Sequence, residues 1–173
     1  YAAITFLTRW LTKTKVLYIC DNIIPHERRW EDRVLTQIGL WYVHYFIVQS
    51  QAVKNDLLHF RPQAIYKEVP HPVYEIFSDQ YTSAEARKHF NFRRNEKVIL
   101  FFGYVRQYKG LHYLIQALPL VRKKIDVKLL IAGEFYDDRE KYLDQIQHLG
   151  LNDSVFVVDD YIPNEEVGLY YRA

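Results

Sequence analysis

The stretch Val98-Ile-Leu-Phe-Phe-Gly103-Tyr-Val-Arg106-Gln-Tyr-Lys109-Gly110 decides how this chain is interpreted. Its first apolar residues predict a buried strand that ends at Gly103, and helical spacing of apolar residues begins at Leu111. N–H groups at a helix start lack partners within the helix, and the helix dipole favours negative charge there. Strand, basic loop and helix start therefore predict an anion site. Arg106 offers a planar fork and Lys109 a point charge, and the ligand we predict is a diphosphate.

The same alternation of short apolar strands and amphipathic helices extends in both directions from this stretch. Strands are predicted over residues 16–20, 45–48, 64–69, 98–102, 127–132 and 155–158, and helices over 2–12, 30–41, 51–60, 83–90, 111–124, 138–149 and from 164 onward. Pro119 is expected to bend or shorten its helix. This order predicts an α/β protein whose parallel sheets are covered on both faces by helices.

Several helix boundaries carry their own signals. Ser50 stands where an N-cap belongs, Thr82-Ser-Ala-Glu85 has the pattern of a capping box, and Asn164 is expected to cap the last helix. Gly150-Leu151 resembles the end of a Schellman motif.

A polar section near residues 73 to 97 divides two α/β series. We predict a first domain over 1–76, a linker with a capping helix over 77–96, and a second domain over 97–173. Ligands of open α/β sheets bind beyond the carboxyl ends of the strands. Three loops take that position: Asp21 to Arg29, Gly103 to Gly110, and Gly133 to Asp138.

Composition excludes some classes of function. The 23 basic and 21 acidic residues give a net charge of +2, which argues against a nucleic-acid partner. The single cysteine excludes an internal disulfide and suits a reducing compartment. The carboxylate pairs Asp137-Asp138 and Asp159-Asp160 are explained by helix capping and a turn, so no metal site is predicted. The absence of methionine and an end inside a predicted helix suggest a piece of a longer protein.

The motifs, taken in order, resemble those of a known family. They are Cys20-Asp21-Asn22-Ile-Ile-Pro25-His26-Glu27, Phe46-Ile-Val-Gln-Ser50, Val69-Pro-His71-Pro-Val-Tyr, Phe101-Phe-Gly103 through Lys109-Gly110, Ile131-Ala-Gly133-Glu134, and Asp160-Tyr161-Ile162-Pro163. In order and spacing the chain resembles a retaining glycosyltransferase of GT-B architecture, in the large nucleotide-sugar family numbered four ("glycosyl transferases group 1"). The resemblance covers nearly the whole chain. It implies two Rossmann-like parallel-sheet domains, both incomplete in this chain, which would be a central piece lacking both ends.

The resemblance also implies roles for residues. Arg106 and Lys109, with Gly103 and Gly110, would hold the donor diphosphate and stabilise the departing nucleoside diphosphate, so no metal would be required. Glu134 would contact the donor, and Tyr161 and Ile162 would line the base pocket through main-chain contacts. The loop around Asp21 and His26 would face the acceptor and carry any catalytic group of the first domain.

The chain departs from the family pattern at three places. The usual arginine directly after the glycine is replaced by Tyr104, and Arg106 follows two residues later. The family often has histidine where this chain has Asp21, and His26 lies five residues on. The family's acidic motif, two glutamates separated by seven residues, would lie beyond Ala173, so this stretch alone is not expected to catalyse transfer.

The resemblance implies partners as well. They are a UDP- or GDP-linked sugar as co-substrate, with no further cofactor, and a glycan or lipid-linked acceptor in polysaccharide biosynthesis. The expected location is the cytoplasm, at the inner membrane face if residues 2–15 contact lipid through their aromatic side. Packing of that helix on the first sheet is the preferred interpretation. Two other functions stay open, a non-catalytic nucleotide- or glycan-binding module and a sugar-nucleotide epimerase.

Overall fold

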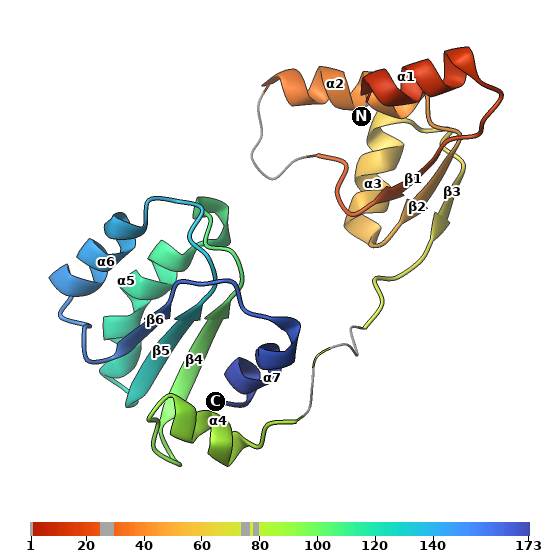
Figure 1. Cartoon of the computed structure of the whole chain (residues 1–173). Coiled ribbons are helices and arrows are strands. Elements are labelled where there is room, and N and C mark those ends of the chain that lie inside the picture. The colour runs from red at the N-terminus through yellow and green to blue at the C-terminus, as the bar shows by residue number, and fades with distance from the viewer. Residues whose placement is uncertain (1, 25–29, 74–76, 78–79) are drawn as a thin grey trace. The chain divides into compact units, whose positions relative to one another are not determined.

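The computed structural model describes residues 2–24, 30–73, 77 and 80–173. In the ranges that begin at residues 2 and 30, side chains are described from residue 3 and from residue 34 onward. The chain divides into two compact units, Tyr1–Val73 and Tyr74–Ala173. Each unit contains one three-stranded sheet (Figure 1).

The first unit is built around the parallel sheet β1-β2-β3. Its elements are α1 (Ala2–Leu11), β1 (Leu17–Cys20), α2 (Trp30–Trp41), β2 (Tyr45–Val48), α3 (Gln51–Phe60) and β3 (Tyr66–Glu68). Leu17 pairs with Tyr45, and Phe46 pairs with Tyr66, so the three strands begin at one edge of the sheet.

The core of the first unit lies on one face of its sheet. Phe46 and Val48 pack there with Leu57 of α3 and Leu40 of α2. On the opposite face, Leu17 and Ile19 are more than half exposed. The described residues therefore leave this face of the sheet partly open, contrary to the expectation that helices cover both faces, and α1 packs mainly against α2.

The second unit is built around the parallel sheet β4-β5-β6. Its elements are α4 (Ser83–His89), β4 (Lys97–Phe102), the 3-10 turn η1 (Gln107–Lys109), α5 (Leu111–Arg122), β5 (Val127–Ala132), α6 (Arg139–His148), β6 (Val155–Val158) and α7 (Asn164–Arg172).

This second sheet is covered on both faces, as the sequence predicted. Successive side chains of a strand point to opposite faces. Leu129 and Ile131 of β5 accordingly pack with α5 and α6, whereas Leu130 and Ala132 pack with α4 and α7. Figure 1 shows α5 and α6 on one side of the sheet and α7 on the other. The result is a three-layer α/β unit whose strands all end at the same edge.

The capping signals mostly behave as predicted. The Ser50 hydroxyl accepts a hydrogen bond from the Val53 N–H at 3.2 Å, and Thr82 and Glu85 form the capping box. Leu151 N–H donates to the Ile146 carbonyl, and Gly150, with φ 63°, donates to Gln147, as in a Schellman motif.

Two boundaries differ from expectation. The N-cap of α7 is Pro163 rather than Asn164, because proline with φ −59° already turns the chain and Asn164 becomes the first helical residue. Helix α5 continues through Pro119 but ends at Arg122, two residues before the predicted end. Among the helices of the described residues, none is both long and apolar enough to cross a membrane.

Candidate functional site

The candidate site begins where β4 and β5 end side by side. Phe102 pairs with Ala132, and each strand is followed by a glycine in the left-handed region, Gly103 with φ 102° and Gly133 with φ 136°. A Cβ atom added to Gly133 would lie 2.4 Å from the Gly103 carbonyl oxygen. The two loops therefore leave the sheet in backbone contact, which only glycine at position 133 permits.

Val105 holds the two loops together one step further on. Its N–H donates to the Glu134 carbonyl at 2.9 Å, and its own carbonyl accepts from the Tyr136 N–H at 3.0 Å. Its side chain is fully buried in the core between the sheet and α5. Because neighbouring side chains of an extended segment alternate, Tyr104 and Arg106 lie on the other side of the loop from Val105.

The lysine of the basic loop folds back toward the strand end. The Lys109 Nζ atom lies 3.5 Å from the position that a Cβ atom of Gly103 would occupy. Gly110, with φ 75°, ends η1 and is also the N-cap of α5, without a side chain to cap that helix. The ammonium group, the end of β4 and the start of α5 are thus brought together, and these features together suit an anion.

Arg106 lies against an aromatic pair. Its guanidinium carbon is 4.9 Å from the centre of the Tyr136 ring, and the Tyr104 ring meets Tyr136 edge-on at 4.8 Å. Electrostatic repulsion from Tyr136 and then from Glu134 raises the pKa of the Tyr104 hydroxyl above its usual value. Arg106 and Tyr104 therefore lie on the same face of this loop.

The remaining predicted residues of this unit lie at the same edge. Glu134 follows Gly133, half-buried, and its carbonyl is held by Val105. Tyr161 is exposed after β6 and donates its N–H to the Asp160 carboxylate at 2.8 Å, while Ile162 packs on the core. Asp159 accepts from the Phe135 N–H at 3.2 Å and so joins the loops after β5 and β6.

The predicted residues of the first domain belong to the other unit. Asp21 follows β1 and is exposed, next to the buried Cys20. Burial, and then the Asp21 charge, raises the pKa of the Cys20 thiol to about 11, so this thiol is not a nucleophile at neutral pH. His26 lies outside the residues that the structure describes.

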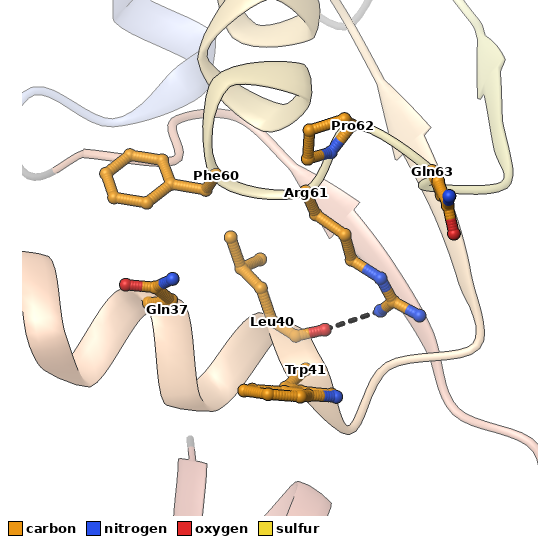
Figure 2. A pocket seen from close by; sticks show the side chains of 7 residues that line it. All are labelled: Gln37, Leu40, Trp41, Phe60, Arg61, Pro62 and Gln63. Carbon is orange, nitrogen blue, oxygen red and sulfur yellow. Dashed lines mark hydrogen bonds between the residues drawn. The ribbon is translucent and has the colours of Figure 1, made fainter.

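A hollow of about 480 Å³ lies elsewhere in the first unit, where α2 and α3 end. Figure 2 shows its lining: Gln37, Leu40, Trp41, Phe60, Arg61, Pro62 and Gln63. Arg61 Nη1 donates to the carbonyls of Leu40 and Val43, both at 2.6 Å, so this arginine ties the end of α3 to the loop before β2. The strands begin at this edge, so the hollow is separate from the Asp21 loop, which follows the end of β1.

The carboxylate pairs have structural partners. Asp138 caps α6 by accepting from the Glu140 N–H, and Asp137 accepts from the Tyr142 hydroxyl at 2.9 Å. Asp159 forms an ion pair with Arg139 at 2.9 Å. Within the described residues no group of three or more potential metal ligands occurs.

Sequence reasoning missed Tyr136 and the anchoring role of Val105. The contact between Arg106 and Tyr136 joins residues thirty positions apart, and it depends on how the loops after β4 and β5 meet. The signal that was available is the pair of glycines that end two adjacent strands, because each makes a close approach possible.

Similar solved structures share this fold. Sucrose-phosphate synthase from Thermosynechococcus elongatus matches with a TM-score of 0.76 at 19% identity, over 99% of this chain and 45% of that one. Anabaena Alr3699/HepE, solved in complex with UDP and glucose, matches with a TM-score of 0.75 at 18% identity, over 93% and 46%. The chain thus spans about half the length of these proteins, and the likeness shows a fold of the GT-B type.

Sequence comparisons point the same way. An uncharacterized glycosyltransferase of Methanocaldococcus jannaschii, MJ1607, is 40% identical over 62 residues, which cover 32% of this chain and 15% of that protein. The family model described as "Glycosyl transferases group 1" matches residues 82–173, more than half of the chain, including both loops of the candidate site. The chain therefore belongs to the glycosyl transferases group 1 family.

Proposed function

We propose that the second unit binds the diphosphate of a nucleotide-linked sugar, and that the protein transfers this sugar to an acceptor hydroxyl with retention of configuration. The observation that carries the proposal is that one loop places the Lys109 ammonium group at the end of β4, beside the uncapped start of α5, and also carries Arg106, which lies against Tyr136. In the transfer, the bond from the sugar C1 to the phosphate oxygen breaks, a bond from C1 to the acceptor oxygen forms, and the acceptor hydroxyl proton passes to the departing nucleoside diphosphate.

The leaving nucleoside diphosphate gains negative charge as that bond breaks. Two cations held at the end of β4 stabilise this charge more than they stabilise the intact donor, which is how such groups accelerate a reaction. Glu134, which follows Gly133 in the loop after β5, contacts the donor. Tyr161 and Ile162 line the pocket of the base, which is uracil or guanine.

The acceptor side belongs to the loop around Asp21 and His26. Asp21 is exposed at the end of β1, the edge at which ligands of parallel sheets bind. The acceptor is a glycan or a lipid-linked glycan, and the donor sugar is a hexose.

A lipid-linked acceptor fits the exposed side of α1. Trp10 is 77% exposed, and Ile4, Leu7 and Leu11 are about half exposed or more, with Arg9 beside them. An apolar side with flanking cations suits the surface of an anionic membrane. The proposed location is therefore the cytoplasm, with α1 in contact with the inner membrane face.

Titration of UDP and GDP into the chain by calorimetry tests the proposal. Because a charge-assisted hydrogen bond is lost, Lys109→Ala should weaken binding by roughly tenfold or more, and the remaining affinity should depend less on salt. Lys124→Ala removes an exposed lysine just beyond the other end of α5 and serves as the matched control. Equal UDP and GDP affinity of Lys109→Ala and the unchanged chain would overturn the assignment of Lys109 to the diphosphate site.

Retention is tested on the product. Because the acidic motif is expected beyond Ala173, the assay uses a protein that includes it. With a nucleotide sugar and an acceptor, the anomeric proton coupling in the NMR spectrum of the new glycoside gives its configuration. An inverted centre would rule out the retaining mechanism and leave the nucleotide site intact. Consumption of the donor without an acceptor, giving a second nucleotide sugar, would favour an epimerase instead.

A further inference from the structure

Arg106 lies three residues after Gly103 in the basic loop, two residues beyond Tyr104, the position where the resemblance implies an arginine. The chain is extended at Arg106, with φ −136° and ψ 149°, and Val105 forms an isolated parallel bridge with Phe135. A shift of two residues in an extended segment returns a side chain to the same face. Arg106 thus lies on the same face of the loop as Tyr104, but its backbone starts further from the end of β4.

A long side chain that starts further away needs a support to hold its guanidinium in one place. Arginine side chains have several rotatable bonds, and ordering them costs conformational entropy at the moment of binding. A support that orders the guanidinium in advance reduces this cost.

The loop after β5 supplies a ring in the required position. Tyr136 lies 4.9 Å from the guanidinium carbon, and its backbone N–H is held by the Val105 carbonyl at 3.0 Å. Val105 is itself fixed by complete burial of its side chain. The hydrogen bonds between Val105 and the loop after β5 therefore fix the backbone next to both Arg106 and Tyr136.

Tyr104 completes the arrangement. Its ring meets Tyr136 edge-on, with 69° between the ring planes, a geometry that aromatic pairs prefer. Tyr104, which stands where the resemblance implies an arginine, thus braces the Tyr136 ring that supports Arg106.

We propose that Tyr136, braced by Tyr104, is a positioning residue that orients the Arg106 guanidinium toward the donor diphosphate. The inference rests on the proposed nucleotide site and adds to it a pair of tyrosines that act through the arginine. Neither ring needs to touch the phosphates.

A double-mutant cycle with UDP as the probe tests the inference, using calorimetry on the full chain. Tyr136→Leu removes the ring and should weaken UDP binding about two- to fivefold, which corresponds to the loss of an exposed cation–π contact. Tyr136→Phe keeps the ring face and should retain the affinity. In the Arg106→Ala background, Tyr136→Leu should have no further effect.

The cycle separates positioning from general damage to the loop. Tyr45→Leu changes a tyrosine at the start of β2 in the first unit, 44% exposed against 56% for Tyr136, and should leave UDP affinity unchanged. Circular dichroism of each variant checks that the fold survives. A loss for Tyr136→Leu that persists fully without Arg106 would overturn the positioning role.

The outcome also distinguishes this inference from the function on which it rests. If Lys109→Ala weakens UDP binding but Tyr136→Leu does not, the nucleotide site stands and the tyrosine support is wrong. If the unchanged chain binds neither UDP nor GDP, both proposals fall together.

Discussion

Tyr142 shows how a single side chain of the second unit responds to its surroundings. Its ring lies on the buried face of α6 and is almost wholly buried, and its hydroxyl donates to the Asp137 carboxylate at 2.9 Å. Burial, followed by this hydrogen bond to a negative group, raises the pKa of Tyr142 to about 12. The phenol is therefore kept neutral in the folded chain well beyond its ordinary range.

This shift predicts how stability changes at alkaline pH. Because the pKa is raised in the folded state, the contribution of Tyr142 is fully present below the ordinary value of about 10 and is lost as pH rises toward about 12. Tyr142→Phe should lower the stability of the second unit at neutral pH by about 1 kcal/mol and make the alkaline decline shallower. Urea unfolding followed by circular dichroism between pH about 8 and about 11.5 measures both effects.

The matched control is Tyr113→Phe, because Tyr113 is 69% exposed. This change should leave both the neutral stability and the alkaline slope unchanged. An alkaline slope of Tyr142→Phe identical to that of the unchanged chain would contradict the burial argument.

Arg106 and Lys109 were proposed as site residues because charged residues after a strand and a glycine have few structural roles there, and their role stays a prediction. The sequence did not allow Tyr136 to be predicted. A tyrosine in a loop is most often an ordinary surface residue, and its significance comes from a neighbour thirty positions earlier in the chain. The role of a residue can be predicted from sequence when the interactions that explain it involve residues nearby in the chain.

At the scale of elements, the ends of adjacent parallel strands organise the site. Gly133 and Gly150 are both in the left-handed region, but for different reasons. Gly133 must approach the Gly103 carbonyl, whereas a Cβ atom at Gly150 would meet open space. The first is a packing requirement between elements, and the second only ends a helix.

This difference predicts unequal costs for the same substitution. Gly133→Ala should destabilise the second unit by more than about 2 kcal/mol, since it combines a backbone clash with a strained φ. Gly150→Ala carries only the strain of a left-handed residue and should cost about 1 kcal/mol. Chemical unfolding of both variants, followed by circular dichroism, gives the two values, and equal costs would show that the loops can move apart.

The elements themselves were largely predictable because apolar runs and cap residues are local signals. The strand over 127–132 and the helix over 51–60 have the predicted bounds. The turn η1 and the cap of α7 were not predicted, because Pro163 and the left-handed Gly110 act through backbone geometry that pattern alone does not reveal. Coverage of the first sheet was misjudged because it depends on where α1 packs.

At the scale of the whole molecule, each unit has a core of its own. The core of the first unit contains Leu57, and the core of the second contains Leu129, both fully buried. The three tryptophans, Trp10, Trp30 and Trp41, all belong to the first unit. Tryptophan emission therefore reports on that unit alone.

Separate cores predict separate unfolding transitions. Leu129→Ala should destabilise the second unit by about 2–5 kcal/mol and shift the transition seen by circular dichroism, but leave the tryptophan curve in place. Leu57→Ala, the matched change in the first unit, should shift the tryptophan curve. A tryptophan curve displaced by Leu129→Ala would show that the two units unfold together.

Under the proposed function, the backbone contact between Gly103 and Gly133 also indicates which positions to vary in order to alter the preference for a donor. Random libraries that include position 133 would mostly yield misfolded clones. Tyr104, Glu134 and Tyr136 lie on the same loops, project from a backbone that Val105 holds in place, and are at least partly exposed. A library restricted to these three positions should therefore sample new specificities on an unchanged frame.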